Sequence, residues 1–201
     1  MDEIENQKQK LTTSPSPLKD FLAIVWDLAV IFVIVFVIIA PFRIFIAEPF
    51  VVSGSSMVPN FHDRDYLIVD RITYRTHAPE RGDVVVLKYP KDTSQYFIKR
   101  IIGLPGETVI FQQGHTIIKN SQYPDGFTLT EPYLTSPVET IGKIEPTVLG
   151  SEEYFVMGDN RTASSDSRVW GVLPKKDIIG RVWVRVFPFS SSGFIDRVNY
   201  K

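Results

Sequence analysis

The chain has 201 residues, 22 Lys and Arg against 23 Asp and Glu, a formal net charge of −1 and 44% hydrophobic residues. This composition supports a sizeable core and excludes a wholly disordered chain, and the lack of any basic block argues against binding to nucleic acid. The absence of cysteine excludes disulfides, thiolate metal ligands and a cysteine nucleophile.

The first 40 residues divide into a polar segment and an apolar one. Residues 1–20 mix charges of both signs around a Ser-Pro repeat, which predicts a short tail without packed structure. Residues 21–40, FLAIVWDLAVIFVIVFVIIA, would span the roughly 30 Å of bilayer hydrocarbon as a helix. The run is longer than the apolar core of a cleavable leader, and its aliphatic residues outweigh the one charge, Asp27. We therefore predict one transmembrane helix and a partner in the lipid bilayer.

Positive charge predicts the orientation of this span. Lys8, Lys10 and Lys19 precede the apolar run, while Arg43 follows it. Because lysine and arginine concentrate in cytoplasmic flanks, the N-terminus is predicted to be cytoplasmic and residues 41–201 extracytoplasmic. The host would be the cell membrane or an internal membrane of the thylakoid type.

From residue 48 onward the sequence is typical of β structure. Short runs rich in Val, Ile, Phe and Tyr, such as YLIVD, DVVVLKYP and GRVWVRVF, alternate with Gly, Pro and Asp. Turn residues at Pro105-Gly106 and Gln113-Gly114 favour antiparallel hairpins over a parallel sheet. The predicted fold class is a mostly β, antiparallel domain over residues 41–201. Pro and Gly between 121 and 150 indicate a looser β excursion within it, at about 104–157.

Histidine offers little support for a metal site. His62, His77 and His115 stand singly, without the spacing of a zinc site, so neither a metal nor a cofactor is predicted. His62 could serve Ser56 as the base of a triad, but the G-x-S-x-G elbow of such enzymes is missing.

Lysine is the other base that a serine can use. It must then be neutral, which requires a pKa below the ordinary value of about 10.4. Lys99 lies inside the apolar strand YFIKRIIG, where alternation places Phe97, Lys99 and Ile101 on one face. A strand lysine whose ammonium reaches water is the alternative that this pattern leaves open.

Three segments behind the apolar span together resemble type I signal peptidases, the membrane-bound Ser-Lys proteases that remove leader peptides. They are SGSSMVP at 53–59, YFIKRIIGLPGE at 96–107 and GDNRTASSDSRVWG at 158–171. The resemblance runs from about Glu48 to Pro188 and includes EPYL at 131–134 and GRVWVR at 180–185. It implies a serine endopeptidase that acts on preproteins without metal or cofactor.

The same resemblance implies residue roles. The nucleophile is Ser56, the general base is Lys99, and Ser164 orients the lysine. A structural pair, Asp166 and Arg168, and a scaffold of Asp159 and Asn160 surround them. This sequence departs from the family at Gly54, where some members carry a serine that helps to bind the oxyanion, and at Thr162-Ala163, where many carry Asp-Asn.

Substrate preference is also implied by the resemblance. The pockets for the residues one and three before the cut match five apolar side chains: Phe50, Val52, Met57, Phe97 and Ile98. Such pockets would take small uncharged residues at −1 and −3 of the signal peptide. Plain core packing is the alternative for these five side chains.

Two other functions share parts of this sequence pattern. A membrane-tethered, non-catalytic β domain that binds partners would share the anchor and the strands. A self-cleaving Ser-Lys repressor would share the dyad, but the apolar span and the absence of an N-terminal DNA-binding domain argue against it. The sequence makes no prediction of oligomeric state.

Overall fold

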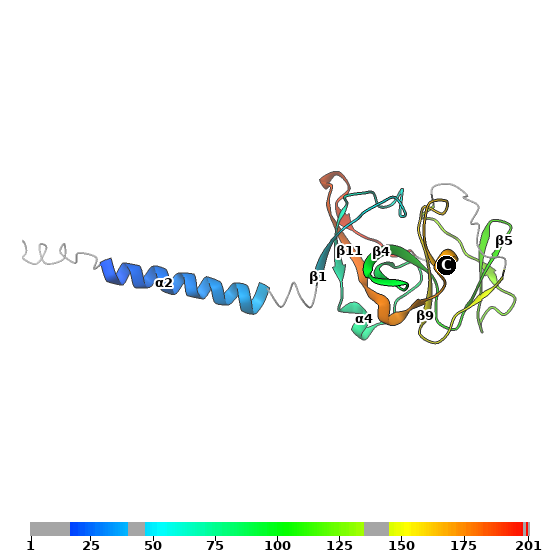
Figure 1. Ribbon diagram of the computed structural model, residues 1–201, viewed down its shortest axis with the longest axis horizontal. Coiled ribbons are helices and arrows are strands. Elements are labelled where there is room, and N and C mark those ends of the chain that lie inside the picture. The colour runs from blue at the N-terminus through cyan, green and yellow to red at the C-terminus, as the bar shows by residue number, and fades with distance from the viewer. Residues whose placement is uncertain (1–16, 40–46, 135–144, 199, 201) are drawn as a thin grey trace, which may run out of the picture. The chain divides into compact units, whose positions relative to one another are not determined.

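The computed structural model describes residues 17–39, 47–134, 145–198 and 200 (Figure 1). The chain forms two compact units, residues 1–44 and residues 45–201. Residues 1–16 of the predicted tail (1–20), residue 40 of the predicted span and Arg43 lie outside the described residues, whereas residues 17–20, predicted to lack packed structure, are helical.

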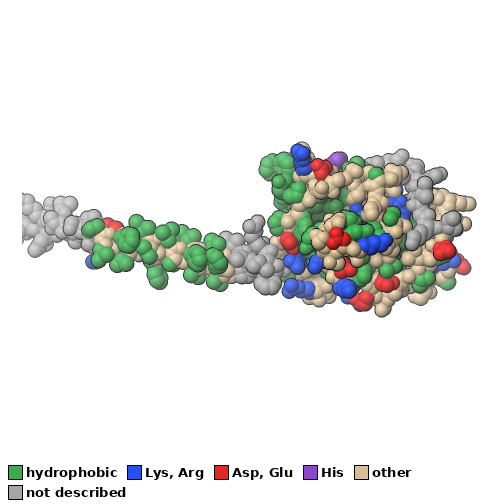
Figure 2. Space-filling model, in the orientation of Figure 1, with side chains coloured by type: hydrophobic (Ala, Val, Ile, Leu, Met, Phe, Trp, Pro, Cys, Tyr) green, Lys and Arg blue, Asp and Glu red, His purple; other side chains and the backbone are tan. Residues whose placement is uncertain are grey.

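The first unit contains the helix α2 (Pro17–Ile34), continued by a π-helical turn, η1 (Val35–Ile39). The helix begins four residues before the predicted span, with proline at its first position, where the missing N–H would have no intrahelical partner. None of its residues is buried, and residues Pro17–Val37 have a mean hydropathy of 2.6. Hydrophobic side chains cover the visible face of α2 (Figure 2). Its length and composition are therefore those of a membrane span.

The second unit is built on an antiparallel sheet, which confirms the predicted fold class. Its order is β1-β2-β11-β3-β4-β9-β10, with β12 pairing β11. The strands are β1 (Ala47–Val51), β2 (Tyr66–Asp70), β3 (Val84–Tyr89), β4 (Asp92–Gly103), β9 (Glu153–Met157), β10 (Leu173–Pro174), β11 (Ile178–Phe187) and β12 (Gly193–Phe194). The described helices of this unit are short: α4 (Thr73–Thr76), α5 (Ser167–Trp170), η2 (Lys175–Asp177) and η3 (Phe189–Ser191).

Between β4 and β9 the chain forms a second, smaller sheet of order β7-β6-β5-β8. Its strands are β5 (Thr108–Gln112), β6 (His115–Lys119), β7 (Phe127–Thr128) and β8 (Thr147–Val148). Gln113 and Gly114 both have positive φ, 50° and 78°, and join β5 to β6. This is the backbone of a tight hairpin turn, as the residue types predicted.

The core covers both faces of the central strands β3 and β4. Val84, Val86 and Ile98 belong to one buried cluster. On the opposite face, Val85, Leu87 and Ile101 belong to another. Because buried clusters cover both faces of β4, polar side chains in its second half, such as Lys99 and Arg100, are also buried.

Candidate active site

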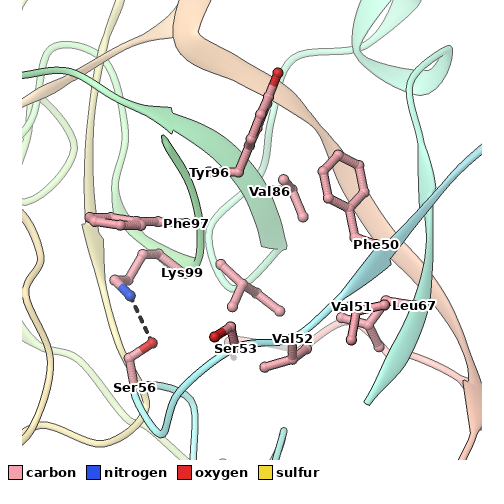
Figure 3. A pocket seen from close by; sticks show the side chains of 11 residues that line it. Phe50, Val51, Val52, Ser53, Ser56, Leu67, Val86, Tyr96, Phe97 and Lys99 are labelled. Atoms are coloured by element: carbon pink, nitrogen blue, oxygen red, sulfur yellow. Dashed lines mark hydrogen bonds between the residues drawn. The ribbon is translucent and has the colours of Figure 1, made fainter. Parts of the chain in front are cut away.

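Ser56 and Lys99 meet although 43 residues separate them in the chain. Ser56 lies in the loop after β1, and Lys99 lies in the central strand β4, opposite Val85 of β3. Lys99 Nζ is 2.8 Å from Ser56 Oγ, at hydrogen-bond distance (Figure 3). The hydroxyl and the amine can therefore exchange a proton directly.

Burial changes the acidity of Lys99. Lys99 is only 4% exposed. The loss of hydration on burial disfavours the charged ammonium and lowers the pKa of Lys99 from 10.5 to about 8. The carboxylates of Asp166 and Asp159 act in the opposite direction, while Arg168 adds to the lowering. The ring of Phe97, 5.2 Å from Nζ, also favours the charged form modestly. Desolvation outweighs these effects, and with a pKa of about 8 roughly a tenth of Lys99 is a neutral amine at pH 7, far more than at the ordinary lysine pKa.

The loop that carries Ser56 turns sharply just after a paired segment. Val52 N donates to Asp65 O at 2.9 Å, and Arg64 N donates back to Val52 O at 2.9 Å. Gly54 follows with φ of 91°, a conformation that side chains other than glycine rarely adopt. Its N–H donates to Asp63 Oδ1 at 2.9 Å, which fixes the turn.

The loop after β9 holds Ser56 from the other side. Asn160 N donates to Ser56 O at 3.0 Å, and Asn160 Nδ2 donates to Ser55 O at 3.1 Å. The preceding residue, Asp159, accepts two hydrogen bonds from the buried guanidinium of Arg100, at 2.8 and 2.7 Å. Arg100 directly follows Lys99 in β4, so this ion pair connects the strand of Lys99 to the loop that holds Ser56.

Asp166 and Arg168 form a second ion pair in the same loop. Arg168 Nε and Nη2 donate to the two oxygens of Asp166 at 2.8 and 2.7 Å, and Gly158 N donates to Asp166 at 3.0 Å. Burial alone would raise the pKa of Asp166, but the hydrogen bonds and the charge of Arg168 outweigh it and hold this pKa below its ordinary value. Asp166 is thus a fixed negative charge that anchors the loop.

Ser164 lies beside the nucleophile loop without contacting the dyad by a hydrogen bond. A Cβ built on Gly158 would come within 2.3 Å of both Ser164 Oγ and Ser56 O, so both residues pack against this glycine. Ser164 Oγ is buried and hydrogen-bonds to no described residue. It lies close enough to the Asp166 carboxylate to help lower the pKa of that group, but without normal hydrogen-bond geometry.

An apolar cleft of about 110 Å³ opens beside Ser56 and Lys99 (Figure 3). Four of the five predicted pocket residues line it: Phe50, Val52, Phe97 and Ile98. The fifth, Met57, is 1% exposed within the core cluster that also contains Val52, and it is not among the residues that line this cleft.

Several lining residues were missed from the sequence, namely Val51, Ser53, Leu67, Val86 and Tyr96. Tyr96 shares a strand face with Ile98, and this alternation could have predicted it. Val86 lies opposite Ile98 on β3, a neighbour that only the register between the strands reveals.

The EPYL segment also has a role that the sequence did not predict. Glu131 accepts hydrogen bonds from both Nη atoms of Arg161, and Arg161 Nε donates to Gly158 O at 3.2 Å. The Tyr133 ring lies 4.0 Å from the guanidinium carbon of Arg100. These residues therefore brace the loop that carries Asp159 and Asn160.

Residues 25–187 match the protein family described as signal peptidase, peptidase S26. The chain belongs to this family. Probable signal peptidase I-1 of Synechocystis sp. is 39% identical over 158 residues, 75% of this chain and 76% of the relative. Signal peptidase I P of Bacillus subtilis subsp. natto is 35% identical over 175 residues, 83% of this chain and 89% of the relative.

A solved signal peptidase I shows the same likeness. The crystal structure of this protein from Enterococcus faecalis V583 shares 30% sequence identity and a TM-score of 0.44, covering 53% of this chain and 97% of that one. As a member of the signal peptidase family, the chain is a hydrolase, a serine peptidase that cleaves signal peptides from secreted preproteins. Its apolar helix fits a single-pass membrane protein. Family membership therefore argues against both alternatives, the non-catalytic binding domain and the self-cleaving repressor.

Proposed function

We propose that Ser56 is the nucleophile of this signal peptidase and that Lys99 is its general base. The observation that carries this proposal is the 2.8 Å hydrogen bond between Ser56 Oγ and the buried Lys99 Nζ. Burial lowers the pKa of Lys99 to about 8, so that the neutral amine, the form that can accept the hydroxyl proton, is populated at a slightly alkaline pH. Each chemical step can then proceed without a metal or cofactor.

In the first step, neutral Lys99 takes the proton of Ser56 Oγ while this oxygen attacks the scissile carbonyl carbon. The tetrahedral intermediate collapses as the C–N bond breaks, and the lysinium gives its proton to the departing amine of the mature protein. Water then attacks the acyl-enzyme, with Lys99 accepting its proton and returning it to Ser56 Oγ. The signal peptide leaves as a carboxylate, and the dyad is restored.

The developing oxyanion needs hydrogen-bond donors, and Gly54 has no side chain to provide one. The backbone N–H of Ser56 is the donor that the loop offers, since it has no acceptor among the described residues. A preorganised donor of this kind is worth about 10²–10³ in turnover. Ser164, packed against Gly158 beside the Ser56 loop, is proposed to orient Lys99.

We further propose that the cleft selects small uncharged residues at −1 and −3 of the signal peptide. An apolar cavity of about 150 Å³ accommodates a benzene ring, so a cleft of about 110 Å³ is too small for large side chains. Charged side chains would be desolvated without a partner. β1 is an edge strand of its sheet, and an extended substrate can pair with its open side beside Ser56.

Our proposal for the membrane topology divides the chain into three parts. We propose residues 1–20 as a cytoplasmic tail, 21–40 as the span and 41–201 as the extracytoplasmic catalytic domain, in the cell membrane or a thylakoid-type membrane. Exposed aromatic side chains of the second unit, including Phe187, Phe189 and Phe194, would favour contact with the lipid interface. Protease added to intact spheroplasts should digest residues 60–201, and full protection would contradict this orientation.

The proposed function is tested by incubating the purified full chain with one labelled preprotein and mapping the cut. Cleavage just after a small residue at the end of the signal peptide, and its loss in Ser56→Ala, are the expected results. A Ser56→Ala variant that cleaves at the wild-type rate would show that another nucleophile acts.

A further inference from the structure

The N–H of Ser56 can stabilise an oxyanion only if its direction is fixed. It belongs to the peptide group that joins Ser55 to Ser56, and in a trans peptide the C=O and the N–H point in opposite directions. Fixing the Ser55 carbonyl therefore fixes the Ser56 N–H. The contacts of that carbonyl decide how well the donor is preorganised.

Two donors hold the Ser55 carbonyl. Asn160 Nδ2 donates to it at 3.1 Å, and Val58 N donates to it at 3.2 Å from within the same loop. Asn160 makes a further contact through its backbone. Its N–H donates to Ser56 O at 3.0 Å and fixes the peptide group that joins Ser56 to Met57. Asn160 thus holds the peptide groups on both sides of the Ser56 Cα, and the N–H of the first of them, that of Ser56, is left without an acceptor among the described residues.

The Asn160 amide is itself oriented. Thr162 Oγ1 donates to Asn160 Oδ1 at 3.2 Å, which identifies the acceptor end of the amide and turns its NH₂ toward Ser55. The residues before and after Asn160 both form buried ion pairs, Asp159 with Arg100 and Arg161 with Glu131. These contacts restrain the backbone of residues 159–161 and so fix the position of the Asn160 amide.

We propose that Asn160 is a positioning residue for catalysis, which aims and polarises the Ser56 N–H as the oxyanion donor, and that Thr162 sets the direction of its amide. A hydrogen bond accepted by the carbonyl end of a peptide strengthens the N–H at the other end as a donor. Asn160 hydrogen-bonds to the backbone around Ser56 and not to Ser56 Oγ or Lys99 Nζ. The inference rests on the proposed function, because it requires Ser56 to be the nucleophile.

The test compares Asn160→Ala and Thr162→Val with the wild-type full chain in detergent, using one preprotein substrate. Asn160→Ala keeps the backbone bond to Ser56 O and loses only the amide. Since the oxyanion donor is then misaligned and not removed, kcat should fall by about tenfold, less than for outright loss of a donor, with KM unchanged within about twofold. Thr162→Val should lower kcat less, by about threefold, because the amide remains but can rotate.

Two inhibitors separate this role from a merely structural one. A signal-peptide aldehyde forms a hemiacetal with Ser56, and its oxygen occupies the oxyanion position, whereas the carboxylate product peptide forms no such adduct. The aldehyde should lose affinity in parallel with kcat, while the product peptide should bind as it does to the wild type. The acid limb of the pH profile should not move, since Lys99 is untouched.

Matched controls come from the second sheet. Asn120→Ala removes an asparagine that accepts hydrogen bonds from two loop N–H groups, and Thr128→Val removes an exposed threonine hydroxyl on β7. Both should leave kcat unchanged, even if Asn120→Ala lowers the melting temperature. An unchanged kcat in Asn160→Ala, or equal losses of aldehyde and product affinity, would overturn the inference.

Failure of the inference and failure of the proposed function give different results. If Ser56→Ala retained turnover, the proposed nucleophile would be wrong. If turnover depended on Ser56 but neither position 160 nor position 162 affected kcat, only the role of Asn160 would be refuted. Should Asn160→Ala fail to fold, Thr162→Val decides the matter, since its altered hydroxyl lies on an exposed residue.

Discussion

Arg100 and Asp159 form a buried, bidentate ion pair that joins the strand carrying Lys99 to the loop after β9, which holds Ser56. Arg100 is the neighbour of Lys99 in β4, and Asp159 is the neighbour of Asn160, whose backbone holds Ser56. Asn60, four residues after the nucleophile, adds a third hydrogen bond to Asp159 at 2.9 Å. The geometry of the dyad therefore depends on a pair of charges that do no chemistry themselves.

Asp159→Ala should leave the buried Arg100 guanidinium without its partner. Such a loss costs about 3–5 kcal/mol of unfolding free energy, and the dyad should lose activity with it. Denaturant unfolding monitored by tryptophan fluorescence measures the first effect. Glu48→Ala is the matched control, because its ion pair with Arg71 is 39% exposed on both sides and should contribute less than about 1 kcal/mol. Equal destabilisation by the two variants would contradict the assigned role.

Replacing the dyad residues should separate catalysis from folding. Ser56→Ala and Lys99→Ala should each abolish preprotein cleavage while the β domain remains folded, because each removes a reacting group. Ser55→Ala and His62→Ala should retain substantial activity, and Ser164→Ala should be intermediate. Single-turnover cleavage, with circular dichroism as the folding control, checks this order. Wild-type turnover in Lys99→Ala would exclude the lysine as the base.

The lowered pKa of Lys99 predicts that both activity and folding stability rise with pH, over different pH ranges. Activity should rise through an apparent pKa of about 8 in the pH profile of kcat/KM, because only the neutral amine accepts the proton. Folding stability should also rise with pH between about 8 and 10.5, because the unfolded state binds the lysine proton more tightly in that range.

Lys99→Met removes this buried amine and tests the second effect. The variant should be inactive yet more stable than the wild type at pH 7, and its advantage should shrink toward pH 10.5, where the unfolded lysine is itself half neutral. Melting temperatures measured at several pH values give the comparison. A stability difference that is constant with pH would show that the Lys99 pKa is not lowered by folding.

Gly158→Ala should disturb the site by sterics alone. The added methyl group would come within 2.3 Å of Ser164 Oγ and of the Ser56 backbone oxygen. Because the second contact is with backbone, relieving it requires the Ser56 loop to move. Overpacking of this kind costs about 1–3 kcal/mol, and here it should also displace the nucleophile and lower kcat. Gly150→Ala is the control, since the added methyl would meet only the flexible end of Glu153. Full activity in Gly158→Ala would mean that the loops can separate without harm.

The cleft predicts the substrate range. In a peptide series that varies only position −1, Ala should be cleaved, whereas Phe and Lys should be rejected for lack of room and for desolvation. The same order is expected at −3. Phe50→Ala should enlarge the cleft and relax the exclusion of larger residues at one of these positions. Equal cleavage of all three peptides by the wild type would show that the lining side chains serve only the core.

The sequence by itself determined the broad class of this protein. The apolar run, with Asp27 as its one charge, predicted a helix long enough to span a bilayer, because hydrophobicity and length are both local properties of a chain. The β-branched runs and their turn residues predicted antiparallel strands, and the order of three motifs indicated a signal peptidase. The exact start of α2 was not predicted, since proline at position 17 opens the helix inside a segment that composition alone marks as polar.

Only the tertiary structure decided the state of Lys99. Alternation within one strand cannot distinguish a lysine whose ammonium reaches water from a buried one. The groups that surround the Lys99 amine come from the loops that carry Ser56 and Asp166, which are distant from Lys99 in the chain. The same limit explains Met57, which lies in the core, and Val86, which reaches the cleft through its register with Ile98. Desolvation and strand register arise from contacts between distant segments, and no local pattern of residues specifies them.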